Sequence, residues 1–583
     1  MTTSSIKKIP YGVSDFKKIR EENFYFVDHS WAIPYIERDS YVFLLRPRRF
    51  GKSLFINMMQ TYYDVLEADK FDALFSDLAI GKEPTEKHNK YLILRFNFSE
   101  VSAKSDNVEQ VFNDSVCQVI TDFAQKYGAL LRPDTAESIA KYSGDSSAML
   151  RQLIMCVKRS QRRMYVMIDE YDNFANTILS YDEDGYAGMT HGDGFFRYFF
   201  NILKAGTTDN DAAIDRIFIT GVSPLCLSDV TSGFNIGMNY SLDPDLHASI
   251  GFTESEVRTM LSYYKEQTGV FKHSVDELIE VMRPFYDNYC FTEDNLDDER
   301  MFNSDMTLYF LNCYIKSRGA LPKEMIDPNI STDYNKMQML IRFESRFGQK
   351  SKIVQRTIND GYADYDLKRE FSLATLGVAE NVPSLLYYMG LLTWGHDAEN
   401  YPVMVVPNEV VRSQFLRYMQ TCYANTIQWR PDIDHLNDLW RGCVRRAEWK
   451  PFLAYVSSLV TDNSSVRDFD PEGESFVKGF MLTYLGTSTG YLSHTEYEMS
   501  HGYADIYLEP QGINRHALIV ELKYCKPTST DAEVASLAKA AEEQAEKYAA
   551  DHGLAETAAS RNWTLTKSVI VFRGWNTEVL KVW

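Results

Sequence analysis

Residues 46–53 of this sequence read RPRRFGKS, and this stretch decides how the first part of the chain folds. An apolar run, YVFLL at residues 41–45, precedes it, and a helical pattern, LFINMM at residues 54–59, follows it. This order predicts a strand, a phosphate loop and a helix. In such a loop, backbone N–H groups at a helix N-terminus surround phosphates, a lysine reaches the outer phosphates and a hydroxyl ligates Mg²⁺. Gly51, Lys52 and Ser53 supply those three parts.

The loop departs from the usual pattern G-x-x-x-x-G-K-[ST] because Arg46 stands in place of the first glycine. A basic turn between a strand and a helix is the alternative interpretation of so degenerate a motif. The flanking strand and helix patterns favour the phosphate loop. The predicted nucleotide-binding residues of this stretch are Arg48, Arg49, Phe50, Gly51, Lys52, Ser53 and Leu54.

A second stretch supports the same interpretation. The apolar run MYVMI at residues 164–168 ends in Asp169 and Glu170. In a nucleotide site, an aspartate at the end of a buried strand holds the Mg²⁺ shell, and the following glutamate can orient an attacking water. We therefore expect Ser53 and Asp169 to bind the metal and Glu170 to act as the catalytic residue. An ordinary strand end with two solvated acids is the alternative.

Strands separated by helices indicate a parallel sheet in this first region. A strand is predicted at residues 91–98, helices at 108–123 and 148–159, and a further strand at 216–219. Thr220 follows that last strand, where it can sense the γ-phosphate or simply cap the strand. The glycine-rich residues 184–194 lack a preceding strand, so we predict a mobile loop there and a helix from 195 to 204. The segments at 16–20 and 24–28 are expected to cover the nucleotide pocket.

Length and composition restrict the possible classes of protein. A chain of 583 residues is expected to form about three or four domains. Its net charge of -20 argues against tight, nonspecific binding of nucleic acid over the whole surface, though not against a local basic groove. The eight cysteines lack C-x-x-C spacing, and no signal peptide or apolar run of about 18 residues occurs. We expect a soluble cytoplasmic protein with reduced thiols and no membrane association.

The middle of the chain is predicted to be mainly helical. Thr253 and Glu256 have the spacing of a capping box, and we expect a lid and a small helical domain from about 255 to 425. Patterns at 384–394, 401–406 and 409–418 indicate a helix, a β-hairpin and a helix. This order is winged-helix-like, but such modules bind DNA, bind protein or only pack.

The last part of the chain carries a second group of candidate residues. A helix is predicted at 474–485, strands near 495–499, at 503–508, 516–523 and 568–572, and a helix between the last two. Glu521 and Lys523 share one face of their strand because residues two apart do so. If Asp505 meets them across the hairpin, two carboxylates and an ammonium converge.

Such oxygen ligands suit Mg²⁺ or Mn²⁺, and a lysine there can polarise a phosphate or assist an attacking water. This combination is typical of phosphodiester cleavage. A solvated strand edge ending in Glu-x-Lys is the alternative. The apolar residues 518–520 favour a central strand instead, so we predict that Asp505, Glu521 and Lys523 are catalytic and that the two acids bind the metal.

With these two groups of residues, the sequence resembles a family of uncharacterised prokaryotic AAA-ATPase-like proteins that end in a PD-(D/E)XK nuclease-superfamily domain. The motifs that carry the resemblance are FVD at 26–28, LRPRRFGKS at 45–53, IDEYD at 168–172, TGVS at 220–223, GFT at 251–253, GYAD at 502–505 and ELK at 521–523. In this family the arginine-rich phosphate loop is the expected form. One departure is Tyr503, where the family often has an arginine that faces nucleic acid.

The resemblance implies an α/β fold class: an AAA+-like P-loop NTPase with a parallel sheet, a helical and winged-helix-like middle region, and a C-terminal restriction-endonuclease-like α/β domain. The expected domains are residues 1–255, 256–425, 426–465 as a helical linker, and 466–583. The expected function is ATP binding and hydrolysis that gates a Mg²⁺-dependent nuclease-like domain acting on nucleic acid. The alternative is a nucleotide-controlled binding switch that does not cleave. A homo-oligomer or a protein partner is expected to use the middle region.

Overall fold

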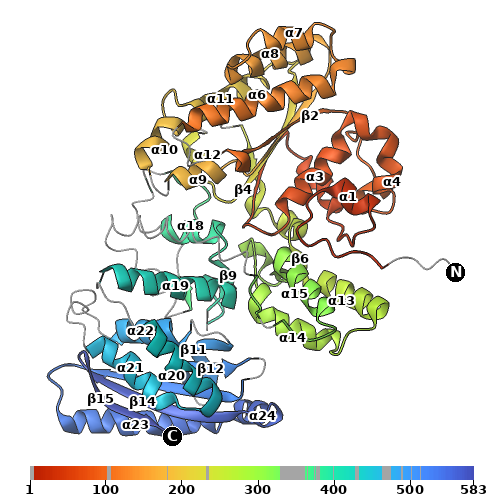
Figure 1. Ribbon diagram of the computed structural model, residues 1–583. Coiled ribbons are helices and arrows are strands. Elements are labelled where there is room, and N and C mark those ends of the chain that lie inside the picture. The colour runs from red at the N-terminus through yellow and green to blue at the C-terminus, as the bar shows by residue number, and fades with distance from the viewer. Residues whose placement is uncertain are drawn as a thin grey trace. The chain divides into compact units, whose positions relative to one another are not determined.

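A computed structural model describes residues 6–101, 107–179, 182–230, 236–322, 324–327, 357, 361–363, 366–372, 375, 381–397, 399–426, 432–461, 474–486, 490–499, 502–511 and 514–583. The chain divides into two compact units (Figure 1). Unit 1 comprises residues 1–343 and 365–407, and unit 2 comprises residues 344–364 and 408–583. The four-part division of the chain expected from the sequence stays a prediction.

Unit 1 is built on a five-stranded sheet whose paired strands all run parallel. Its strands are β1 (Tyr41–Leu45), β2 (Leu92–Asn97), β3 (Met164–Asp169), β4 (Ile214–Gly221) and β5 (Met238–Asn239), in the order β2-β3-β4-β1-β5. The parallel α/β core predicted from the sequence is confirmed. Strand β4 lies between β1, which leads into the phosphate loop, and β3, which ends in Asp169.

The helices that follow the strands cover this sheet. Helix α3 (Lys52–Tyr63) contacts β3, and helix α6 (Val108–Lys126) contacts β2 (Figure 1). Every residue of β3 is buried, as expected of a parallel strand that is covered on both faces. Met59 and Tyr63 of α3 pack with Tyr165 and Met167 of β3 in the main core cluster. The sheet therefore fixes where α3 begins, and with it the phosphate loop.

Unit 1 contains further helices and two short strands. They are α1 (Phe16–Glu21), α2 (Ile33–Ile36), α4 (Phe71–Phe75), α5 (Ala79–Lys82), α7 (Thr135–Ala140), α8 (Ser146–Arg159), α9 (Asn173–Leu179), α11 (Phe195–Ala205), α12 (Leu225–Val230), β6 (Phe252–Thr253) and β7 (Met301–Phe302). The helices predicted at 148–159 and 195–204 are confirmed.

The prediction of a mobile loop at 184–194 is wrong for most of that segment. Residues Glu183–Thr190 form helix α10, whose N-cap is Asp182. The Asp182 side chain accepts a hydrogen bond from Gly185 N at 2.9 Å. Tyr186 is fully buried and donates to the Asp229 carboxylate at 2.8 Å. Capping and a buried tyrosine therefore outweigh the low helix propensity of the glycines, and only the turn at 191–194 remains irregular.

Four more helices and a hairpin belong to unit 1. They are α13 (Glu254–Thr268), α14 (Val275–Tyr286), α15 (Ser304–Lys316), α18 (Asn381–Tyr388), β9 (Thr393–His396) and β10 (Pro402–Val405). The capping box of Thr253 and Glu256 at the start of α13 is confirmed. The order helix, hairpin, helix is confirmed too, but its second helix, α19 (Glu409–Thr426), belongs to unit 2.

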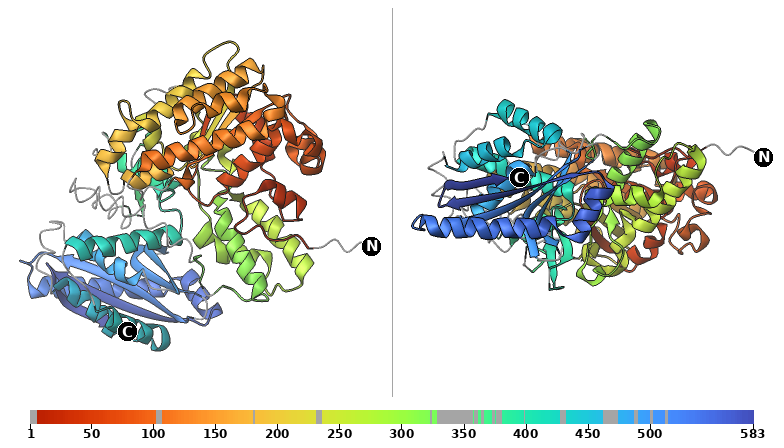
Figure 2. Two further views of the ribbon diagram at one scale, coloured as in Figure 1. Left: turned by 45° about the horizontal axis from the view of Figure 1, so that its top comes forward. Right: turned by 90° about the horizontal axis from the view of Figure 1, so that it is seen from below.

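Unit 2 contains a mixed five-stranded sheet in the order β11-β12-β13-β14-β15. Its elements are α20 (Ile433–Arg446), α21 (Trp449–Thr461), α22 (Glu474–Leu485), β11 (Tyr491–Met499), β12 (Gly502–Pro510), β13 (His516–Cys525), α23 (Asp531–Ala549), α24 (His552–Ser560), β14 (Thr564–Arg573) and β15 (Asn576–Val582). Strands β13 and β14 pair in parallel, and the other neighbours are antiparallel. Figure 2 shows the long helix α23 lying along this sheet. Residues 462–465, the end of the expected helical linker, lie outside the described residues.

None of the helices in the described part of the chain combines the length and the apolar character that crossing a bilayer would require.

Candidate functional site

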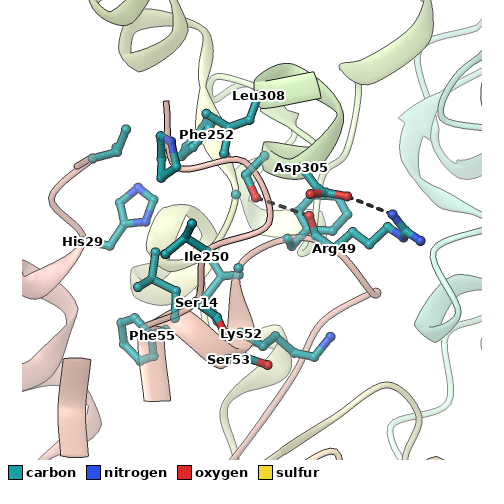
Figure 3. Close-up of a pocket in the computed structure, with 18 of the residues that line it drawn as sticks. Ser14, His29, Arg49, Lys52, Ser53, Phe55, Ile250, Phe252, Asp305 and Leu308 are labelled. Carbon is teal, nitrogen blue, oxygen red and sulfur yellow. Dashed lines mark hydrogen bonds and ion pairs between the residues drawn. The ribbon is translucent and has the colours of Figure 1, made fainter. Parts of the chain in front are cut away.

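A cavity of about 590 Å³ lies at the phosphate loop of unit 1 (Figure 3). It is lined by residues 48–55, by residues 249–252, by Ser304, Asp305 and Leu308 of α15, and by parts of residues 10–14 and 25–29. The predicted cover at 24–28 is thus confirmed for Tyr25, Phe26 and Val27, whereas α1 does not line the cavity. The volume falls in the usual range for small-molecule pockets.

Lys52 and Ser53 open helix α3 at this cavity. The Lys52 ammonium donates to the carbonyls of Arg46 at 2.9 Å and Pro47 at 2.8 Å, so its own loop holds it in place. Figure 3 shows the Lys52 and Ser53 side chains extending in the same direction. Gly51 precedes them with a φ of 102°, a left-handed conformation that favours glycine. This geometry can present an ammonium, a hydroxyl and helix N-terminal N–H groups to one anion.

The three arginines of the loop lie in different surroundings. Arg46 is buried, and its guanidinium donates to the carbonyls of Leu45, Ser241 and Leu246 at 2.6–3.0 Å. Burial lowers the Arg46 pKa to about 10. Arg48 and Arg49 line the cavity. Arg46 therefore fastens the loop to the body of unit 1, while Arg48 and Arg49 remain candidates for phosphate binding.

Arg48 and Arg49 each bind a side chain of another element. Arg48 donates to the Asn173 side chain at 2.6 Å, and Arg49 donates to Asp305 of α15 at 2.9 Å (Figure 3). The Arg49 carbonyl also accepts hydrogen bonds from Asp305 N and the Ser304 hydroxyl, both at 3.2 Å. The start of α15 is therefore attached to the phosphate loop. No local sequence pattern indicates this contact, which joins residues about 255 positions apart.

Two further predicted residues of the loop meet the cavity with apolar side chains. Leu54 lines it. Phe50 also contributes to the lining, but most of its ring is buried. The centre of the ring lies 4.8 Å from the ring centre of Tyr289 and 5.4 Å from that of Phe291. Phe50 is thus an anchor of the loop as much as a wall of the pocket.

Asp169 and Glu170 end strand β3 as predicted. Asp169 is buried; one of its oxygens lies 3.5 Å from the Arg95 guanidinium, and the other, Oδ1, has no hydrogen-bond partner within the described ranges. Glu170 lines the cavity and has a φ of 51°. Burial raises the Glu170 pKa, although the charges of Lys52 and Arg48 act in the opposite direction. A glutamate of raised pKa that lines the cavity suits a general base.

Asp169 and Thr220 do not belong to the cavity lining. Thr220 is buried at the end of β4, and its hydroxyl donates to the Leu44 carbonyl of β1 at 2.8 Å. Because the C-terminal ends of β1, β4 and β3 are adjacent, Thr220 lies between the phosphate loop and Asp169. The structure thus brings Lys52, Ser53 and Glu170 to one cavity, whereas Asp169 and Thr220 are buried and do not line it. The roles assigned to all of them stay predictions.

The two residues after Glu170 have a role that sequence analysis missed. Asp172 is buried and accepts hydrogen bonds from Val222 N at 3.1 Å and Ser223 N at 2.8 Å. The Tyr171 hydroxyl donates to the Ser223 carbonyl. Together they fasten the exit of β3 to the exit of β4. An acid two positions after Asp-Glu was the only available signal.

The second candidate site lies in unit 2, where β12 and β13 separate. Lys523 donates to Glu521 Oε1 at 2.7 Å, and Leu522 N donates to Asp505 Oδ2 at 2.9 Å. Pairing of the two strands places Ile506 opposite Val520, so Asp505 and Glu521 come next to each other. The structure brings the three predicted residues together, and their catalytic roles stay predictions.

The electrostatics of this group are those of a crowded, buried site. Glu521 is buried, and burial together with the Asp505 charge raises its pKa to about 7. Burial acts to lower the Lys523 pKa, but its hydrogen bond to Glu521 and the nearby carboxylates raise it overall. Glu521 Oε2 has no hydrogen-bond partner in the described part of the chain. The group therefore places two carboxylates and an ammonium close together, beside an unsatisfied oxygen.

Lys478 of α22 is a residue of this site that sequence analysis missed. Its ammonium lies 3.7 Å from Asp505 Oδ1, and its side chain is mostly buried. It precedes Asp505 by 27 positions on a different element, so local pattern gave no signal. A second cation therefore lies beside Asp505.

Both sites fit a divalent cation only with help from water or substrate. Within the described ranges, no group of three or more His, Cys, Asp or Glu side chains is placed to hold a metal ion. Each site nevertheless contains a buried carboxylate oxygen, Asp169 Oδ1 or Glu521 Oε2, that has no hydrogen-bond partner among the residues the structure describes. Mg²⁺ is commonly bound by one or two carboxylates and completes its shell with water and phosphate oxygens. The donor sets are compatible with that ion.

Two family models match the chain. Residues 10–231 match a model described as a predicted AAA-ATPase, and residues 472–582 match one described as the PD-(D/E)XK nuclease superfamily. Each match covers the region that holds one of the two groups of residues.

Two comparisons with individual proteins give weaker likenesses. An uncharacterised protein in the vnfD 5′ region of Azotobacter chroococcum mcd 1 is 28% identical over 261 residues, which is 43% of this chain and 44% of that protein. The chain therefore spans less than half the length of this relative. Among solved structures, the Aeropyrum pernix ORC2 protein in ADPNP–ADP complexes gives a TM-score of 0.29 at 11% identity, over 69% of this chain and 98% of that one.

Proposed function

We propose that this protein is a nucleotide-gated nuclease. The chain carries an AAA-ATPase-like domain at residues 10–231 and a PD-(D/E)XK nuclease-superfamily domain at 472–582. Unit 1 binds and hydrolyses ATP, and its nucleotide state controls a Mg²⁺-dependent site in unit 2 that acts on nucleic acid. The observation that carries the proposal is the convergence of Lys52, Ser53 and Glu170 on one cavity of about 590 Å³.

In unit 1 each residue has a distinct part. The Lys52 ammonium exchanges its loop carbonyls for phosphate oxygens, and the N–H groups at the start of α3 bind the same anion. Glu170 accepts the proton of the attacking water, since its raised pKa makes it a better base than an exposed carboxylate. Ser53 and Asp169 would hold Mg²⁺, which neutralises charge on the phosphates. Arg48 and Arg49 add positive charge beside them.

In unit 2 the two carboxylates and the two lysines have different roles. Asp505 and Glu521 would hold Mg²⁺ or Mn²⁺, which stabilises negative charge on a phosphodiester. Lys523, fixed by Glu521 at 2.7 Å, orients the attacking water or binds the scissile phosphate. Lys478 balances the charge of Asp505 before substrate arrives.

The test uses the purified full-length chain. Binding of a fluorescent ATP analogue and release of phosphate are measured first, and single- and double-stranded DNA and RNA are then incubated with Mg²⁺ or Mn²⁺, with and without ATP. The proposal expects saturable ATP binding and cleavage of at least one nucleic acid that changes with ATP. Absence of ATP binding contradicts the first half, and absence of cleavage under every condition contradicts the second.

The second candidate function is a nucleotide-controlled switch whose unit 2 binds nucleic acid or protein without cutting it. The net charge of -20 and the exposed Tyr503, two residues before Asp505, favour it. ATP-dependent retention of nucleic acid without cleavage would support this function. In both cases we place the protein in the cytoplasm and assign contacts with a second copy or a protein partner to the middle region.

A further inference from the structure

The part of the unit 1 cavity away from the phosphate loop is suited to a nucleobase. Its lining includes the apolar residues Val13, Ile250, Phe252, Met260 and Leu308. Figure 3 shows Phe252, Leu308 and His29 on a different side of the cavity from the Lys52 ammonium. Apolar walls suit a flat base, and the few polar groups among them decide which base is accepted.

His29 is a polar side chain in this region that a neighbouring carboxylate holds in place. Its Nε2 lies 3.1 Å from Glu256 Oε1. The other oxygen of Glu256 accepts a hydrogen bond from Thr253 N at 2.8 Å, within the capping box of α13. Glu256 does not line the cavity, so it holds His29 from behind. The imidazole is thereby fixed in both position and orientation.

This pairing determines what His29 offers to a ligand. A carboxylate only accepts hydrogen bonds, so Nε2 carries the proton that lies between His29 and Glu256. In the neutral ring Nδ1 is then an acceptor, and none of the described residues donates a hydrogen bond to it. An acceptor at this position pairs with an amino N–H and repels a carbonyl oxygen.

We propose that His29 selects the nucleobase, its Nδ1 accepting a hydrogen bond from the exocyclic amino group of adenine. Guanine and hypoxanthine carry a carbonyl oxygen where adenine carries that amino group. The inference rests on the proposed function, because it concerns the base of the nucleotide that unit 1 binds. One neutral hydrogen bond corresponds to roughly threefold to tenfold in affinity, so ATP should bind about tenfold more tightly than GTP or ITP.

A single substitution can reverse this preference. In Glu256→Gln, the amide oxygen stays with Thr253 N, and the capping box is kept because glutamine also serves at this position. The amide NH₂ then faces His29 Nε2, which must become an acceptor. The proton moves to Nδ1, and Nδ1 now donates to the carbonyl oxygen of GTP or ITP.

The experiment measures competition of ATP, GTP and ITP against a fluorescent ATP analogue on the full-length chain. Wild type should prefer ATP by about tenfold, and His29→Phe should bring the three affinities within about threefold of one another. Glu256→Gln should favour ITP and GTP over ATP. Glu254→Gln is the matched control: Glu254 lies in the same helical turn but binds Arg258 and Arg283, and its variant should keep the wild-type ratio.

The outcomes separate this inference from the proposed function. ATP binding with the same base preference in wild type, His29→Phe and Glu256→Gln overturns the role of His29 and leaves the ATP site intact. No binding of any nucleotide by the wild type overturns both. A preference that is lost in His29→Phe and inverted in Glu256→Gln supports the inference, since a purely structural role of His29 would weaken all three nucleotides alike.

Discussion

Single residues of the phosphate loop have different roles even where the residue type repeats. Arg46 donates to three backbone carbonyls and lies 4.4 Å from the centre of the Phe291 ring. Arg49 binds Asp305, and Arg48 binds Asn173. A basic sequence therefore does not mean a basic surface, because one of its three guanidinium groups is buried inside the protein.

The role of Arg46 predicts that lysine cannot replace it. A lysine ammonium cannot reach carbonyls spread across a planar guanidinium, so Arg46→Lys leaves buried acceptors without donors. We expect a loss of about 2 kcal/mol in the free energy of unfolding of unit 1, measured by urea denaturation. Arg162→Lys changes an exposed arginine in the same way and should have almost no effect. Equal stability of the two variants would contradict the role of Arg46.

His247 gives the stability of unit 1 a predictable dependence on pH. Its Nδ1 accepts from Phe291 N at 3.3 Å and its Nε2 donates to the Glu299 carbonyl at 3.2 Å. Burial lowers its pKa from 6.5 to about 4. Below pH 6.5 the unfolded chain takes up a proton that the folded chain refuses, so stability is lost as the pH falls from about 6.5 to about 4. Between pH 7.5 and 5.5 the loss is about 1 kcal/mol.

The measurement must separate the effect of His247 from that of groups whose titration changes stability in the opposite direction. Burial raises the Asp287 pKa to about 6, so this carboxyl adds stability as the pH falls through the same range. Thermal unfolding of wild type and His247→Gln is therefore compared at pH 7.5 and 5.5. The stability difference between the two proteins should shrink by about 1 kcal/mol at the lower pH. A difference that stays constant would show that His247 does not titrate as described.

At the scale of elements, the features that depend on residues close together in the sequence could be predicted from local patterns. Apolar runs identified the buried strands β1 and β3, and alternation placed Glu521 and Lys523 on one face of β13. Helix α10 was missed because its stability comes from burial of Tyr186 and capping by Asp182, which outweigh its glycines. Lys478 and Asp305 were missed for a related reason: tertiary packing brings them to their sites from distant elements.

The turn after helix α18 gives a test of such packing. Gly390 has a φ of 75°, and a methyl group there would lie 2.6 Å from Pro47 Cβ in the phosphate loop. Gly390→Ala should cost about 1 kcal/mol for its backbone conformation and a further 1–3 kcal/mol for the collision. It should also weaken ATP binding, because the loop must move.

The control for this variant is Gly269→Ala. Gly269 ends helix α13 with a φ of 63°, and a methyl group there meets no atom within 4 Å. It should show the backbone cost alone, with normal ATP affinity. Stability is read from thermal unfolding and affinity from a fluorescent ATP analogue. Equal effects of the two variants on both readouts would mean that Pro47 yields without cost.

On the scale of the whole molecule, each compact unit has its own sheet, its own buried residues and its own group of candidate catalytic residues. A ligand that binds only the folded form of one unit stabilises that unit by an amount set by its concentration. Calorimetry should therefore show two transitions, of which ATP with Mg²⁺ at about 100 times its dissociation constant stabilises one by about 2.7 kcal/mol. Lys52→Ala should abolish this shift. Equal shifts of both transitions would contradict binding to unit 1 alone.

The same division predicts that the two activities can be lost one at a time. Asp505→Asn removes a carboxylate charge from the site in unit 2, and Asp505 is not among the described residues that line the unit 1 cavity. Phosphate release from ATP should therefore continue at the wild-type rate while any cleavage of nucleic acid stops. Lys52→Ala should abolish ATP binding, and cleavage should then stay at the level measured without ATP. Lys539→Ala, an exposed change elsewhere in unit 2, serves as the control and should alter neither activity. Loss of both activities in Asp505→Asn, with thermal unfolding unchanged, would show that the two sites do not act separately.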